Sequence, residues 1–332
     1  MSARYYLDPF GCAKNQVDAE TMMGFLQEAR WVSADDPAEA ELIIINSCGF
    51  IESAKQESIN AALEYRKTYP DKKIVLAGCL AQRYAQELSA ALPEADLIFG
   101  NRDLAKITEA AAMALAGGAR RTFLPEASPG VSVPGKRPLL SLPGSAYVKI
   151  AEGCDNHCSF CAIPHIRGPL KSRPLLQVTD ECRELLDRGI KELCLIGQDL
   201  ASYGTDRTEA GRSELPELLE ALSGLEGRFW VRLLYLHPDR FPLPLLELLR
   251  RDSRLLPYFD LPFQHGSPKI LRAMNRRGTV ESYLALIETI RTILPDATIR
   301  STFLTGFPGE TGQDFQVLLD FQAQARLDWV GC

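Results

Sequence analysis

Short apolar runs alternate with helix-like stretches through the first 115 residues or so of the chain. The runs cover residues 5–7, 42–45, 74–77 and 96–99, and the helix-like stretches cover 18–29, 53–65 and 81–92. Continuous runs rich in β-branched residues are typical of strands that are buried on both faces of a parallel sheet. The sequence therefore predicts an α/β domain with a doubly wound parallel sheet, whose strands all end at one edge.

A second strand–helix series begins at residue 146. Its candidate strands are 147–150, 192–196, 230–235, 258–261 and 298–304, and its candidate helices are 176–188, 216–225, 243–249 and 280–293. Such a series predicts a (β/α) barrel with its active site at the carboxyl ends of the strands. Residues 327–332 read like the start of a sixth strand, so we expect a partial barrel that is truncated at the C-terminus.

The segment between the two series is rich in Gly, Pro and Ser from residue 116 to residue 145. This composition is typical of an interdomain connection. The predicted division is therefore a domain over 1–125, a linker over 126–145 and an incomplete barrel over 146–332. A length of 332 residues fits two domains.

Composition excludes some classes of function. The net charge of −6 gives no global basic field for nucleic acid. No stretch reaches the length of a membrane span and the N-terminus lacks a signal pattern, so we expect a cytoplasmic protein. In a reducing compartment, the nine cysteines are expected to be metal ligands or buried thiols rather than disulfides.

Three cysteines, Cys154, Cys158 and Cys161, have the spacing C-x3-C-x2-C. Three thiolates hold three irons of a cubane 4Fe–4S cluster and leave the fourth iron open to a small molecule. Such a cluster is a catalyst rather than an electron wire. The alternative is a zinc site, in which His157 or His165 supplies the fourth ligand that zinc normally takes.

Three further cysteines, Cys12, Cys48 and Cys79, each follow one of the first three apolar runs. The predicted topology gathers them at one sheet edge, where they could bind a second cluster that also has an open iron. Each adjoins a glycine at the strand exit, namely Gly11, Gly49 and Gly78. The alternative is that all three are buried structural thiols.

These motifs resemble a known family. The C-x3-C-x2-C motif, with Phe160 before its last cysteine, resembles the radical S-adenosylmethionine (SAM) superfamily. The segments 11–15, 46–51 and 78–84 resemble the N-terminal domain of the methylthiotransferases. The run Cys-Gly-Phe-Ile at 48–51 resembles the RimO-type branch, which modifies an aspartate of a small-subunit ribosomal protein near the decoding centre. Asp8-Pro9 and Ser47 depart from the usual pattern without touching a proposed ligand.

The resemblance implies two 4Fe–4S clusters and SAM as cofactors. Cys154, Cys158 and Cys161 would be catalytic, and Cys12, Cys48 and Cys79 would hold the second cluster. Comparable loops make Gly197, Gln198, Gly306 and Glu310 candidate SAM contacts, although turn glycines and helix caps would look the same. Basic residues at Arg167, Lys171 and Arg173 would attract the SAM carboxylate or an acidic substrate, or form a solvated loop; His237 and His265 are expected to be structural.

The implied reaction replaces a C–H bond of the aspartate by C–S–CH3. An unactivated methylene has no useful acidity, so the reaction needs a radical. The implied partners are the ribosomal protein and an electron donor of flavodoxin or ferredoxin type, with the chain itself a monomer. The family's small C-terminal β-barrel is not visible in this sequence. Two alternatives remain open, a methylthiotransferase that modifies adenosine in transfer RNA and a non-catalytic iron–sulfur or zinc protein.

Overall fold

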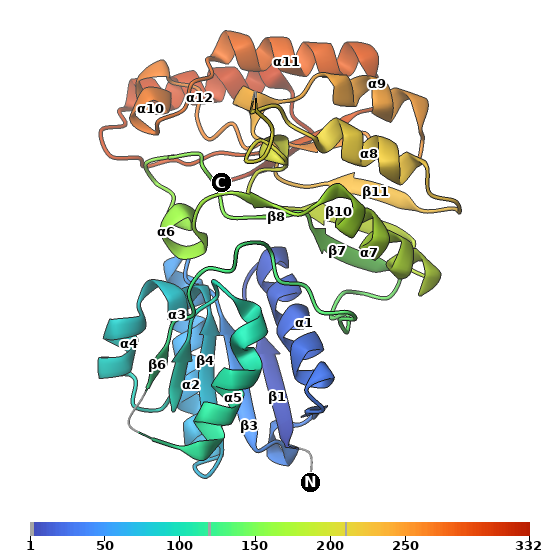
Figure 1. Cartoon of the computed structure of the whole chain (residues 1–332). Helices are drawn as coiled ribbons and strands as arrows, with labels where there is room; N and C mark the ends of the chain where they lie inside the picture. Colours follow the sequence, from blue (N-terminus) through green and yellow to red (C-terminus); the bar gives the residue numbers. More distant parts are fainter. Residues whose placement is uncertain (1–2, 119–120, 210) are drawn as a thin grey trace. The chain divides into compact units, whose positions relative to one another are not determined.

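The computed structural model of the chain describes residues 3–118, 121–209 and 211–332. The chain forms two compact units (Figure 1). The first comprises Met1–Ser141 and Ala162–Pro169, and the second comprises Leu142–Cys161 and Leu170–Cys332. The first unit is therefore discontinuous, because it includes the segment that directly follows the C-x3-C-x2-C motif.

The first unit contains a six-stranded parallel sheet in the order β2-β1-β3-β4-β5-β6. Its strands are β1 (Arg4–Pro9), β2 (Val32–Ser33), β3 (Leu42–Ser47), β4 (Lys73–Gly78), β5 (Leu97–Phe99) and β6 (Thr122–Phe123). Its helices are α1 (Ala13–Glu28), α2 (Glu52–Thr68), α3 (Cys79–Arg83), α4 (Ala85–Ala91), α5 (Ile107–Ala116) and α6 (Ile163–Arg167), with short 3-10 turns at Pro37–Glu39 and Leu104–Lys106. The predicted doubly wound α/β fold is confirmed.

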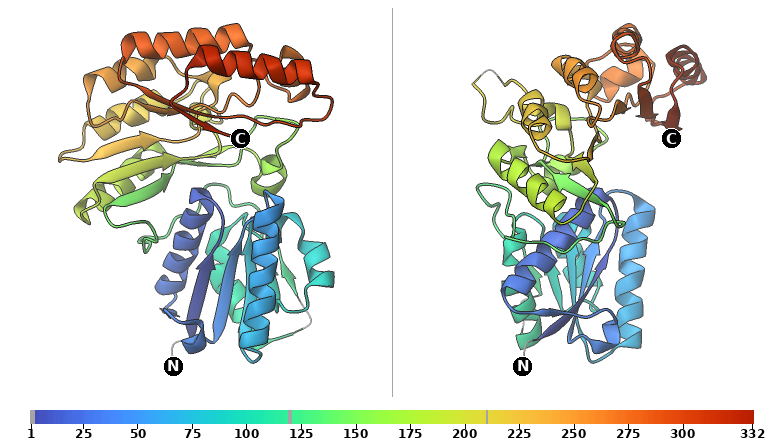
Figure 2. Two further views of the ribbon diagram at one scale, coloured as in Figure 1. Left: turned by 180° about the vertical axis from the view of Figure 1, so that it is seen from behind. Right: turned by 90° about the vertical axis from the view of Figure 1, so that its right-hand side faces the viewer.

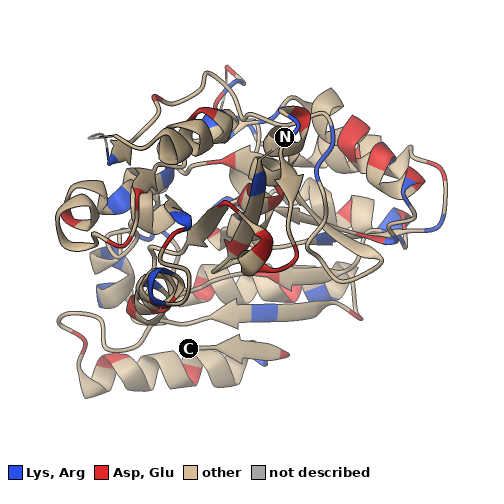
Figure 3. Cartoon of the chain, turned by 90° about the horizontal axis from the view of Figure 1, so that it is seen from below, with Lys and Arg blue, Asp and Glu red and all other residues tan. Residues whose placement is uncertain are grey.

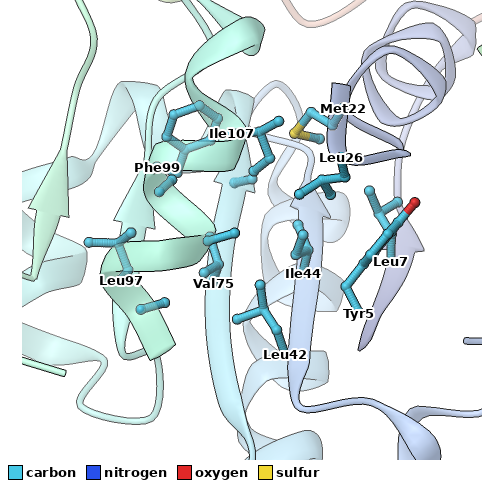
Figure 4. Packing of buried hydrophobic residues seen from close by; sticks show 14 of the residues in the cluster. Tyr5, Leu7, Met22, Leu26, Leu42, Ile44, Val75, Leu97, Phe99 and Ile107 are labelled. Atoms are coloured by element: carbon cyan, nitrogen blue, oxygen red, sulfur yellow. The ribbon is translucent and has the colours of Figure 1, made fainter. Parts of the chain in front are cut away.

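Both faces of this sheet are covered by helices. All six residues of β3 are buried, and their side chains alternate between the two faces. Leu42 and Ile44 pack with α1 and α5, in the core shown in Figure 4. Ile43 and Ile45 pack with α2, α3 and α4 on the other face. Burial on both faces explains why the sequence shows a continuous apolar run here rather than an alternating one.

Part of the Gly- and Pro-rich segment packs along α1. A side chain at Gly24 would meet Pro134 Cγ at 2.6 Å, so the two backbones pass very close. Glu28 Oε1 accepts the backbone N–H of Gly135 at 2.6 Å, and Glu20 Oε1 accepts that of Leu140 at 2.8 Å. The segment therefore has an ordered course over the first unit before the chain enters the second.

The second unit contains six parallel strands in two three-stranded sheets, ordered β11-β10-β7 and β12-β13-β14. They are β7 (Ser145–Lys149), β10 (Glu192–Ile196), β11 (Trp230–Leu233), β12 (Tyr258–Asp260), β13 (Thr298–Thr302) and β14 (Trp329–Gly331). A bridge between Val231 and Leu255 and the hydrogen bond from Leu236 N to Asp260 O join the two sheets. A short antiparallel pair, β8 (Ala151–Glu152) and β9 (Lys171–Ser172), flanks the cysteine loop.

Helices cover the outside of this curved series of strands (Figure 2). They are α7 (Leu175–Asp187), α8 (Leu215–Ser223), α9 (Pro244–Arg251), α10 (Pro268–Ala273), α11 (Val280–Ile293) and α12 (Gly312–Ala325), with 3-10 turns at Leu200–Ser202 and Pro238–Arg240. The predicted partial (β/α) barrel is confirmed. Basic and acidic residues are interspersed along the elements (Figure 3). Within the described residues, no helix has the length and apolar character that crossing a membrane requires.

Candidate functional site

The carboxyl edge of the first-unit sheet carries three cysteines. Cys12 lies between β1 and α1, Cys48 directly follows β3, and Cys79 is the first residue of α3 after β4. The strand order reverses beside β1, and ligands of doubly wound sheets bind at such a reversal, outside the carboxyl ends of the strands. The three cysteines therefore occupy the ligand-binding position of this fold.

Glycines bring the three strand exits into contact. A Cβ atom at Gly11 would lie 3.0 Å from Cys48 Cβ, and one at Gly49 would lie 2.7 Å from the backbone carbon of Cys79. Gly11 therefore packs on Cys48, and Gly49 packs on Cys79. Gly78 has φ +95°, and a Cβ there would lie 2.6 Å from Ser47 O. These contacts form a cradle whose walls are the backbones next to the cysteines.

The thiol of Cys79 is surrounded by polar partners although only 6% of the residue is exposed. It donates to Asn15 Oδ1 at 3.2 Å and accepts from Asn101 Nδ2 at 3.5 Å and Arg167 Nη2 at 3.1 Å. Burial raises its pKa to about 11, an effect that the positive charge of Arg167 opposes. The thiol is thus neutral at pH 7 in the metal-free chain, and metal binding there must release its proton.

Arg167 lies in the first unit, at the end of α6, which packs against α3 (Figure 1). Its Nη2 donates to Asp18 Oδ2 at 2.8 Å and to Asn15 Oδ1 at 2.7 Å. The sequence interpretation assigned Arg167 to the SAM carboxylate, to an acidic substrate or to a solvated loop. The structure instead pairs this guanidinium with a buried aspartate beside Cys79.

The second group of cysteines lies in the loop after β8. Cys154, Cys158 and Cys161 are all partly exposed. Burial raises the pKa of Cys154 to about 11, and the nearby Cys161 and Cys158 thiols also raise it. The backbone N–H of Asn156 donates to Cys154 Sγ at 3.4 Å, which shows a donor already directed at this sulfur. The three thiols share one short loop and interact electrostatically.

Residues next to α10 hold this loop in place. Ser159 donates from its backbone N–H to Met274 O at 3.2 Å and from its hydroxyl to Ala273 O at 2.8 Å. Asn275 Nδ2 donates to His157 O at 2.7 Å, and Asn275 itself has φ 58°. Asparagine is one of the few residues that accept such a backbone conformation readily. No pattern in the sequence indicates that this turn supports the cysteine loop.

Asp199, which follows β10, ties the loop to neighbouring strand ends. Its Oδ2 accepts from Asn156 Nδ2 at 2.8 Å and from Ser202 Oγ at 2.6 Å, and its Oδ1 accepts the backbone N–H of His237 at 3.1 Å. Only 4% of Asp199 is exposed. The sequence interpretation singled out its neighbours Gly197 and Gln198 but gave Asp199 no role, although an acidic residue at a strand exit was the available signal.

The predicted SAM contacts lie at exits of the barrel strands. Gln198 donates to Glu152 Oε1 at 3.3 Å, and its own Oε1 is buried without a hydrogen-bond partner among the described residues, as expected of an acceptor that a ligand would satisfy. Gly306 has φ +75° with open space beside it. Glu310 accepts the backbone N–H of Phe307 at 3.0 Å and lies 3.6 Å from His265 Nε2.

The other predicted basic residues have structural surroundings. Arg173 is 3% exposed and pairs with Glu181 at 2.5 Å, while donating to Lys149 O at 2.9 Å. It therefore anchors α7 to the end of β7 rather than facing solvent. Lys171 lies in β9. His265 is fully buried, and burial lowers its pKa.

All nine cysteines are free thiols. Among the described residues, no group of three or more His, Cys, Asp or Glu side chains is arranged to hold a single metal ion. The cysteines of a cubane bind separate irons, so they need not converge on one point. Both cysteine groups are compatible with this requirement, because Cys79 interacts electrostatically with Cys12, and Cys154 with Cys158 and Cys161, without a common centre among the described residues.

Comparison with known proteins places these features in a class. Residues 148–321, more than half of the chain, match the radical SAM superfamily, and residues 4–100 match the uncharacterized protein family UPF0004. The ribosomal protein uS12 methylthiotransferase RimO of Treponema denticola is 47% identical over 98% of this chain and 74% of its own length. The corresponding protein of Moorella thermoacetica is 45% identical over 97% of this chain and 73% of its own length. The chain belongs to the RimO family of radical SAM methylthiotransferases, and is an enzyme of that type.

Solved structures show the same fold at low identity. The radical SAM methyltransferase TsrM from Kitasatospora setae, solved with cobalamin and a [4Fe-4S] cluster, has a TM-score of 0.67 and 15% identity over 99% of this chain and 74% of its own. The cobalamin-dependent radical SAM enzyme OxsB, solved with aqua-cobalamin and SAM, has a TM-score of 0.67 and 12% identity over 96% of this chain and 52% of its own.

Proposed function

We propose that this chain adds a methylthio group to an aspartate of ribosomal protein uS12. The observation that carries the proposal is the 47% identity to a uS12 methylthiotransferase over nearly the whole chain. The two cysteine groups support it, because the reaction needs both a radical initiator and a sulfur donor. An electron donor of flavodoxin or ferredoxin type would act as a further partner.

Each cysteine group would hold a 4Fe–4S cluster with its own role. Cys154, Cys158 and Cys161 would hold the 4Fe–4S cluster that binds SAM, with Gly197, Gln198, Gly306 and Glu310 as SAM contacts. Cys12, Cys48 and Cys79 would hold a second 4Fe–4S cluster. When bound, the former supplies the electron for reductive cleavage of SAM, and the latter supplies the sulfur.

The protein's own residues position these groups and exclude water. Cys48 and Cys79 are 9% and 6% exposed, so two of the three first-unit thiols are shielded from solvent, whereas Cys12 is exposed. In the second unit, Arg276 Nη1 approaches Cys158 Sγ at 3.9 Å, and Asn156 links the loop to Asp199. Fixed donors near the sulfurs favour negative charge there. Positioning and exclusion of solvent are what a radical reaction requires of its protein.

Iron content and SAM cleavage test the division of labour. The reconstituted chain should bind about eight irons, as two cubanes of four. Cys158→Ala should halve the iron content and abolish release of 5′-deoxyadenosine by dithionite, whereas Cys48→Ala should halve the iron content and spare that release. Cys182→Ala, at a buried position in α7, is the matched control and should retain all the iron. Equal loss of cleavage in the Cys158 and Cys48 variants would contradict the assignment.

Mass spectrometry tests the substrate. Reduced enzyme, SAM and a sulfide source should add one methylthio group to an aspartate of uS12 and leave purified transfer RNA unchanged. The reverse result would identify the chain as a transfer RNA methylthiotransferase. Absence of any SAM cleavage by the fully loaded chain would exclude both.

A further inference from the structure

Arg167 places a buried positive charge at the cysteine edge of the first unit. Its Nη2 atom lies 3.1 Å from Cys79 Sγ, 2.7 Å from Asn15 Oδ1 and 2.8 Å from Asp18 Oδ2. The side chains of Arg167 and Asp18 are 3% and 1% exposed. Water and salt therefore screen their charges far less than they screen charges at the surface.

The two charges do not act equally on the sulfur. The guanidinium donates directly to Cys79 Sγ, whereas Asp18 is joined to it through Arg167. Asn15 is fixed independently, because its Nδ2 donates to Phe10 O at 3.1 Å and Ser47 O at 3.0 Å. The cation is thus held against the sulfur by an anion and an amide that are themselves anchored in the first unit.

Packing of α6 against the first unit does not by itself require a buried ion pair. Burying an ion pair costs desolvation energy that an apolar contact would avoid. The cost is offset where the cation faces a group that becomes negatively charged, and a cysteine that ligates iron is such a group.

We propose that Arg167 is a positioning residue whose charge sets the reduction potential of the cluster held by Cys12, Cys48 and Cys79; this rests on the proposed function, which places a cluster there. A reduced cluster carries one more negative charge than the oxidised one. A buried cation beside a ligand sulfur stabilises the reduced form more and raises the potential, since net charge and hydrogen bonds to sulfur tune such clusters. Asp18 acts in the opposite direction.

Arg167 lies in a segment that directly follows the other cysteine group in sequence. Arg167 follows Cys161 by six residues in sequence, yet α6 belongs to the first unit. One short segment therefore begins next to the last cysteine of the radical SAM motif and ends at Arg167, which places a positive charge beside Cys79 of the other cysteine group.

Redox titration monitored by electron paramagnetic resonance tests this proposal. The parent is the full chain with Cys154, Cys158 and Cys161 replaced by alanine, so that only the first-unit cluster contributes to the signal. Arg167→Met should shift the midpoint potential to more negative values, and Asp18→Asn should shift it to more positive values. Arg102→Met is the matched control, because Arg102 is exposed and its loss changes the net charge equally.

Opposite shifts are the result that a purely structural ion pair would not give. Equal potentials in Arg167→Met and Arg102→Met, or shifts of the same sign in Arg167→Met and Asp18→Asn, would overturn the proposal. If Arg167→Met holds no iron, Asp18→Asn decides alone: a positive shift supports the proposal and any other result refutes it. A parent chain without iron would refute the proposed cluster itself, and this is seen before Arg167 is changed.

Discussion

At the scale of single residues, Gly78 shows how the sheet allows its cysteines to meet. Its φ of +95° is strained for any residue with a side chain. A Cβ there would also lie 2.6 Å from Ser47 O and 2.8 Å from Ser47 N, which are backbone atoms of the neighbouring strand. Those atoms can move only if β3 and β4 separate just where Cys48 and Cys79 begin.

Gly78→Ala should therefore cost more than its backbone strain. We expect a loss of free energy of unfolding of about 1–3 kcal/mol from strain alone, increased by the clash, together with loss of the first-unit iron. Urea unfolding and iron analysis measure the two effects. Gly117→Ala is the control, since Gly117 has φ +67° and a Cβ there would have no atom of the described residues within 4 Å. Equal effects in the two variants would show that the close approach is unimportant.

His237 should make the metal-free chain less stable in acid. Burial, and then the charge of Arg276, hold the pKa of His237 down at about 4, whereas an unfolded histidine has a pKa of about 6.5. As the pH falls below about 6.5 the unfolded state takes up a proton that the folded state refuses, so stability falls by roughly 1.4 kcal/mol per pH unit down to about pH 4.

Urea unfolding between pH 7.5 and 4.5 tests this expectation. In the folded chain His237 Nδ1 accepts the backbone N–H of Asp239 at 3.3 Å, and asparagine can replace that acceptor without titrating. His237→Asn should therefore flatten the acid slope, leaving the share that comes from His265, whose pKa burial also lowers. An unchanged slope in His237→Asn would contradict the assignment.

The positions of the cysteines after strands were predictable from the sequence, because each one follows a recognisable apolar run or lies in a spaced motif. Partners of side chains were not predictable in the same way. From its sequence position, Arg167 was predicted to belong to the loop that follows Cys161. Its acceptors Asp18 and Asn15 lie about 150 residues earlier in the chain. A role for Asp199 was not predicted, because a single acidic residue at a strand exit is ambiguous until its hydrogen-bond partners are known.

At the scale of elements, the turn after α10 supports the cysteine loop of the second unit. Asn275 combines a left-handed backbone with a hydrogen bond to His157 O. Asn275→Gly keeps the backbone and loses the hydrogen bond, whereas Asn275→Ala loses the hydrogen bond and strains the backbone. We expect second-unit iron and 5′-deoxyadenosine release to decrease in the order wild type, Asn275→Gly, Asn275→Ala, with first-unit iron unchanged. Loss of first-unit iron instead would contradict this role.

Element boundaries were predicted less well than element types, for identifiable reasons. Helix α1 begins at Ala13, five residues before the predicted start, and its N-cap is Cys12, which makes no side-chain capping bond. A helix without Ser, Thr, Asp or Asn at its N-cap lacks the usual start signal. Strands β2 and β6 were missed because each has two residues and no apolar run.

At the scale of the whole molecule, the first unit is completed by a segment from later in the chain. A fragment of residues 1–141 would lack α6, so Asp18 would lose the ion pair with Arg167. Losing one partner of a buried pair costs about 3 kcal/mol or more.

We therefore expect the fragment to unfold at lower urea concentration than the first unit does within the full chain. Circular dichroism follows the transition. Asp18→Asn removes a buried charge that has lost its Arg167 partner, so it should stabilise the fragment while destabilising the full chain. Equal effects of this substitution in both contexts would show that α6 contributes nothing through Arg167.

Because the first unit is discontinuous, its parts become available at different stages of protein synthesis. A growing chain emerges from its N-terminus, and domains fold as their residues become available. All strands of the first-unit sheet have been synthesised once Phe123 is made. The surroundings of its cysteines are complete only when Arg167 has also been made. By then Cys154, Cys158 and Cys161 have also been made. The order of synthesis thus delays completion of the first cysteine group's surroundings until all three cysteines of the second group exist, so we expect both groups to become available to iron at the same stage of synthesis.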